Sequence, residues 1–165
     1  MHALLLRNLF LSLHLFSIVI LSTAVVGGLV VHKLLWHAFD EAPEQLPLAA
    51  RMSKLIGLCG ALGGPLLLLT GLGLLASTHF VYWGAAWLSI KLVLYVLLAL
   101  VGILGGRFTE GQLSALIPAQ MARAGQGESV AVDSRLPVLR QRMALFHVAH
   151  IGLFAAIVLL AVFKP

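Results

Sequence analysis

Three long stretches of this sequence contain no Asp, Glu, Lys or Arg, and they restrict the chain to one class of fold. They cover residues 8–32, 55–90 and 143–163. A membrane-spanning helix needs about 20 consecutive apolar residues, so the first and third stretches suit one span each. The second is too long for a single span, and the polar triplet Ser77-Thr78-His79 divides it. The sequence therefore predicts four spanning helices, at about 8–32, 55–76, 81–106 and 143–163.

The composition supports a membrane protein. Apolar residues make up 61% of the chain and charged residues 10%, whereas a soluble domain has about 45–50% and 25%. So few polar side chains cannot cover a water-facing surface, which excludes a soluble enzyme, a disordered tail and a nucleic-acid module. The single cysteine, Cys59, cannot form an intramolecular disulfide. We predict one all-α domain over residues 1–165, an integral membrane four-helix bundle.

The positions of Lys and Arg predict the orientation of this bundle. Eight of them lie in the predicted loops 33–54 and 107–142, whereas only Arg7 and Lys164 lie at the opposite membrane surface. Positively charged loops remain in the cytoplasm, so we expect both termini on the outer side. The apolar run of the first helix is longer than the core of a secretory signal, and we expect this helix to stay in the mature protein.

Ionisable side chains within the predicted spans are the first candidates for function, because they are costly in a membrane. The four that lie there are His14, Lys91, His147 and His150. No span contains Asp or Glu. We expect the remaining histidines to be solvated at the terminus or near the interfaces: His2, His32, His37 and His79.

The intramembrane histidines suit either metal binding or helix packing. His14 shares its helix face with small and partly polar residues, so its ring should point into the bundle. His147 and His150 are three residues apart and share a face, where one can ligate haem iron while the other hydrogen-bonds, or both can link helices. His14 and His150 differ in predicted depth by about two helical turns. Either the last helix is shifted, or the haem is tilted, or the two histidines serve different sites.

Lys91 is predicted to lie roughly three turns inside the third span. Its amine either extends to the membrane surface or pairs with an anion. Because the spans contain no carboxylate, that anion would belong to a ligand, such as a haem propionate or a lipid headgroup.

Four short motifs follow one another along the chain. They are Leu13-His14-Leu15, Pro65 followed by Thr70-Gly71, Trp87-Leu88-Ser89-Ile90-Lys91-Leu92, and the closing Ala161-Val162-Phe163-Lys164-Pro165. Their order resembles the CopD/HemJ-like group of small membrane proteins, which includes copper-resistance CopD domains, HemJ-type protoporphyrinogen oxidases and four-helix relatives. The resemblance implies a bacterial inner-membrane protein in which His14 ligates haem b and Lys91 belongs to the same outer-leaflet site.

We therefore expect a haem b-binding protein of electron transfer, with His14 and His150 as candidate iron ligands and His147 and Lys91 as further cofactor-binding residues. Its partners would be membrane lipid and a quinol or another redox subunit, and no nucleic acid. Three alternatives stay open: a cofactor-free accessory subunit, a HemJ-like oxidase and a CopD-like copper protein. Ser89 replaces a histidine of the oxidase pattern, and the methionines form no soft-metal track across the membrane.

The predicted orientation can be tested with introduced cysteines. In intact cells, a cysteine at Thr78 should react with an impermeant thiol reagent, because this connection is predicted to lie outside. A cysteine at Ser129 should be protected by the membrane. The reverse labelling pattern would contradict the predicted orientation.

Overall fold

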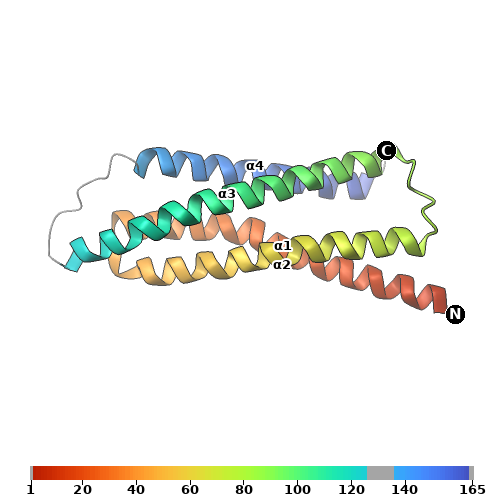
Figure 1. Ribbon diagram of the computed structural model, residues 1–165, viewed down its shortest axis with the longest axis horizontal. Coiled ribbons are helices and arrows are strands. Elements are labelled where there is room, and N and C mark those ends of the chain that lie inside the picture. Colours follow the sequence, from red (N-terminus) through yellow and green to blue (C-terminus); the bar gives the residue numbers. More distant parts are fainter. Residues whose placement is uncertain (1, 126–135, 164–165) are drawn as a thin grey trace.

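The computed structural model describes residues 2–125 and 136–163, and this part of the chain is helical without strands. The elements in chain order are α1 (His2–Asp40), the 3-10 turn η1 (Pro43–Gln45), α2 (Leu46–Ser77), α3 (Ala86–Gly125) and α4 (Leu136–Phe163). Each of the four α-helices includes a segment long and apolar enough to span a membrane, which confirms the predicted all-α architecture. The N-terminal end of α1 and the C-terminal end of α4 lie at the same end of the bundle (Figure 1).

The first two helices extend well beyond the predicted spans, so the prediction of a loop over 33–54 is wrong. α1 continues to Asp40, and the connection to α2 is short. The additional turns carry Leu35, Trp36 and Phe39, which are buried. Burial of such side chains is favourable by about 1.5–3 kcal/mol each, and it holds this part of the chain against α2 and α4. Pro47 falls in the first turn of α2, where a missing N–H is tolerated.

The other two helices also differ from the predicted boundaries. α3 begins at Ala86 instead of 81, because residues 78–84 form turns, among which His79 and Phe80 have φ angles of 53° and 58°. Such left-handed residues interrupt a right-handed helix. α3 then continues to Gly125 and α4 already begins at Leu136, so most of the predicted loop 107–142 is helical where the structure describes it.

The helices associate as two pairs. α1 packs along α2 and α3 along α4, whereas α2 and α3 touch only slightly. The backbones of α1 and α2 approach closely at Gly63, where a Cβ atom would lie 2.9 Å from the backbone nitrogen of Leu21. Small residues permit such contacts between membrane helices.

One hydrogen bond connects the two pairs across the gap between α2 and α3. The hydroxyl of Tyr95 on α3 donates to the backbone carbonyl of Gly64 on α2, at 2.6 Å. Gly64 directly precedes Pro65, where the helical hydrogen-bond ladder lacks one donor. The missing donor is the one to the carbonyl of Ala61, so the Tyr95 bond is an additional contact within one turn of that interruption.

The buried apolar residues form two separate clusters. The interface cluster lies near the η1 end of the bundle and contains Leu35, Trp36, Ala38, Phe39, Leu46, Ala49, Leu139 and Met143. The central cluster contains Leu21, Leu67, Leu98 and Ile157. The bundle is thus held together at two levels.

Substitution of Gly63 by alanine tests the contact between α1 and α2. The added methyl group would meet the backbone of Leu21, so Gly63→Ala should destabilise the protein by about 1–3 kcal/mol. Gly152→Ala is the matched control, because a Cβ atom at Gly152 meets nothing within 4 Å. Thermal unfolding in detergent measures both. Equal melting temperatures for the two variants would contradict the close helix contact.

Candidate functional site

A cavity of about 640 Å³ lies between the two helix pairs and is lined by all four helices. Its walls include Leu21 and Leu98 of the central cluster and Leu35 and Met143 of the interface cluster, so the cavity separates the two clusters. The volume falls within the ~300–1,000 Å³ of sites for small molecules and cofactors. Bundle cofactor sites are commonly formed in this way, from side chains on facing helices.

Three histidines line the cavity: His32 from α1, and His147 and His150 from α4. Two of them are among the predicted site residues. The expectation that His32 is solvated near the interface is wrong, because only 8% of this residue is exposed. α1 continues past His32 and carries the interface cluster, which encloses the ring. A sequence signal existed, since Trp36 lies one helical turn later and can donate a hydrogen bond to an imidazole.

Each α4 histidine lies against a glycine of another helix. A Cβ atom at Gly28 on α1 would lie 3.1 Å from Cε1 of His147, and one at Gly102 on α3 would lie 3.1 Å from Cε1 of His150. Phe146 contacts both rings, with centroid distances of 5.0 and 5.3 Å. The two glycines therefore create the space in which the imidazoles lie beside the cavity.

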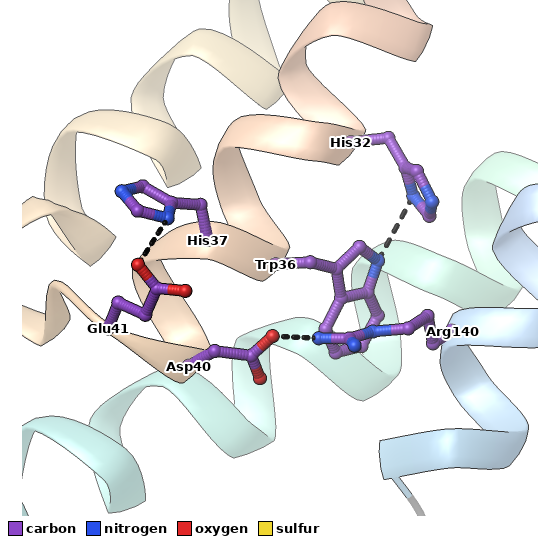
Figure 2. Close-up of polar contacts among 6 residues, drawn as sticks. All are labelled: His32, Trp36, His37, Asp40, Glu41 and Arg140. Carbon is purple, nitrogen blue, oxygen red and sulfur yellow. Dashed lines mark hydrogen bonds and ion pairs between the residues drawn. The ribbon is translucent and has the colours of Figure 1, made fainter.

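The proton of His32 is placed by its hydrogen bond to Trp36 (Figure 2). The indole Nε1 of Trp36 lies 3.1 Å from Nδ1 of His32. An indole N–H can only donate, so Nδ1 must accept. The neutral ring consequently carries its proton on Nε2, and while this bond persists His32 is a hydrogen-bond donor there rather than a metal ligand.

The orientation of Trp36 is fixed in turn by a charged pair between α1 and α4. The guanidinium of Arg140 lies over the Trp36 ring, 4.8 Å from its centroid, and it is also hydrogen-bonded to the carboxylate of Asp40 (Figure 2). Cation–π contacts of this kind contribute about 0.5–1 kcal/mol at exposed sites. Asp40, Arg140, Trp36 and His32 thus form a chain of contacts that ends at the cavity.

His147 and His150 differ in their surroundings. The ring of His147 lies against His32, with ring centroids 5.0 Å apart. In contrast, Nδ1 of His150 is buried and has no hydrogen-bond partner among the described residues. A buried polar atom of this kind costs about 1–3 kcal/mol, and it is an indication of a functional role or of a missing ligand.

His14 lies outside the cavity lining. Its Nδ1 lies 2.9 Å from Oγ1 of Thr70, and that hydroxyl already donates to the backbone carbonyl of Leu66. The same hydroxyl also lies 3.2 Å from the carbonyl of Leu67, so which partner donates in the His14–Thr70 bond depends on the tautomer of His14. Of a shifted helix, a tilted haem and two different sites, the structure therefore favours two different sites for His14 and His150. Iron ligation by His14 stays a prediction.

Lys91 lies within electrostatic range of His14 and not in the lining of the cavity. The expectation that it lies three turns inside its helix is wrong, because α3 begins at Ala86 and Lys91 falls in the second turn. Because the residues just before Ala86 form turns and not helix, the distance from Lys91 to the N-terminal end of α3 is short. The half-buried Lys91 side chain is therefore nearer to the first residue of its helix than predicted.

Among the described side chains, no group of three or more His, Cys, Asp or Glu residues is arranged to hold a metal ion. A comparison of the chain with models of known families, with curated proteins and with solved structures gave no significant match.

The proton position in His32 can be measured directly. In protein with ¹⁵N-labelled histidine at alkaline pH, the long-range ¹H–¹⁵N spectrum should show His32 protonated on Nε2. Trp36→Phe removes the donor and should produce a mixture of the two tautomers, whereas Trp83→Phe, at an exposed position, should not change the spectrum. A wild-type His32 that is protonated on Nδ1 would contradict the assignment.

Proposed function

We propose that the cavity between the helix pairs binds haem b and that the protein takes part in electron transfer, with His150 as the iron ligand. The observation that carries the proposal is a cofactor-sized cavity lined by histidines, one of which, the half-buried His150, has a buried Nδ1 without a hydrogen-bond partner, so that Nε2 is the nitrogen left for iron. Ligation would fix this ring, and imidazole is a common axial ligand of haem.

The residues that are present fit such a group. His147 and His150 lie on one face of α4, so only one of them can approach an iron from that side, and the unpartnered His150 is the stronger candidate. His147 lies between His32 and Phe146, where it supports the position of its neighbours. Leu21, Val25 and Leu98 supply apolar walls that exclude water.

A bound haem supplies one-electron chemistry, and its axial ligand and the polarity of its surroundings set its reduction potential. The role of the protein is to hold the ring, exclude water and direct hydrogen bonds. A membrane quinol or a redox subunit would exchange the electron. The four helices would cross the bacterial inner membrane with both termini outside. Activity as a copper protein, as an oxidase or as an accessory subunit stays a prediction from the sequence.

Spectroscopy of purified protein from haem-replete cells tests the proposal. The wild type should show a Soret band and, after reduction, the α-band of haem b. His150→Ala should lose most of this absorbance, because the iron loses its ligand. His14→Ala should retain it, since His14 lies outside the cavity lining. The exposed His79 provides a matched control, and His79→Ala should behave as the wild type.

Two results would contradict the proposal. A folded but colourless wild-type protein that does not take up added haem would exclude haem binding. A band that disappears in His14→Ala and persists in His150→Ala would move the haem from the cavity to the site of His14 and Thr70.

A further inference from the structure

The cavity has a polar, cationic end and an apolar end. The polar residues beside the α4 histidines are His32 from α1, Ser53 from α2 and Arg107 from α3. At the other end lie Pro65 and Leu68, and the hydroxyl of Tyr95 there already donates to the carbonyl of Gly64. Such a cavity matches an amphipathic ligand rather than a purely apolar one.

The register of the helices brings the three polar residues to one level. α1 and α3 run in the same direction, and His32 and Arg107 each follow, by about one turn, the glycine that contacts an α4 histidine (Gly28 and Gly102). α2 runs in the opposite direction. On α2, Ile56 contacts Gly28. Ser53 lies about one turn before Ile56, and because of the opposite direction of α2 it lies toward the same end of the bundle as His32 and Arg107.

All three residues can donate hydrogen bonds at this level. The Trp36 bond places the His32 proton on Nε2. His32 is 8% exposed and lines the cavity, so the subsite takes its Nε2–H to face the cavity. The guanidinium of Arg107 adds five donors and a permanent positive charge.

No carboxylate of the described residues lines this cavity. Asp40 and Glu41, the nearest acids in sequence to His32, pair instead with Arg140 and His37. The positive charge of Arg107 is therefore not balanced by the cavity wall. The Arg107 side chain is exposed, so its guanidinium is free to pair with an anionic group at this end of the cavity.

We propose that His32, Ser53 and Arg107 form a carboxylate-binding subsite, which holds the anionic end of an amphipathic ligand whose apolar body occupies the rest of the cavity. This inference deepens the proposed function and rests on it in one respect: when the ligand is haem, the carboxylates are those of the haem. The same chemistry would also recognise the carboxylate of a fatty acid.

Metal-free protoporphyrin IX tests the subsite separately from iron ligation. Purified protein in neutral-lipid nanodiscs is titrated with protoporphyrin IX and with its dimethyl ester, and binding is followed by porphyrin fluorescence. The diacid should bind about tenfold more tightly than the ester or better, because only the diacid makes charge-assisted hydrogen bonds. Palmitate and its methyl ester, added as competitors, report on a fatty acid as ligand.

Variants assign the preference to this end of the cavity. Arg107→Gln should abolish the preference for the diacid while leaving binding of the ester unchanged, and Arg107→Lys should restore part of it. Arg142 is the matched control, since it lines a separate, smaller cavity between α3 and α4. Arg142→Gln should keep the full preference.

The outcomes separate the two proposals. Equal binding of acid and ester by the wild type, or a preference that survives Arg107→Gln, overturns the subsite even if haem binds through His150. Porphyrins and added haem that both fail to bind, combined with an Arg107-dependent preference for palmitate over its ester, support the subsite and overturn the haem proposal. The wild-type comparison of acid and ester requires no variant, so misfolding of a variant cannot obscure it.

Discussion

The close contact between the backbones of α1 and α2 determines how the remaining helices can pack. At Gly63 the two helices approach until no side chain separates them. The other interfaces are less close, and α2 and α3 touch only slightly. The resulting space is the cavity, which is closed at two levels by the interface cluster and the central cluster. The cavity is therefore a consequence of where the small residues lie.

Glycines and aromatic residues together shape this cavity. Gly28 and Gly102 leave room for the imidazoles of His147 and His150, which a methyl group would displace. Phe146 fixes both rings from the side. On α1, Trp36 sets the tautomer of His32, and Arg140 holds Trp36 in place (Figure 2). The hydrogen-bonding character of the polar end of the cavity thus depends on Trp36 and Arg140, which do not line it.

The bundle contains two polar locations that the sequence alone could not separate. One consists of His14, bonded to Thr70, with Lys91 in its vicinity. The other is the cavity with His32, His147 and His150. The resemblance of the motifs drew attention to the first, whereas the unpartnered nitrogen of His150 and the size of the cavity favour the second. Only in the second does the hydrogen bonding fix a tautomer, because the indole N–H of Trp36 can only donate to His32.

The sequence by itself determined the class of the protein and the number of its helices, because uncharged apolar runs of this length have few other stable structures. It also named His147 and His150, since a titratable group in an apolar run stands out without any knowledge of the fold. It did not determine that α1 continues through Trp36, or that His32 is buried, because these depend on apolar surface supplied by α4, far away in the chain. Only the tertiary structure brought His32, Ser53 and Arg107 to one end of a cavity. Their juxtaposition follows from the relative register of three helices, which depends on side-chain packing between them and not on the hydropathy of any one segment.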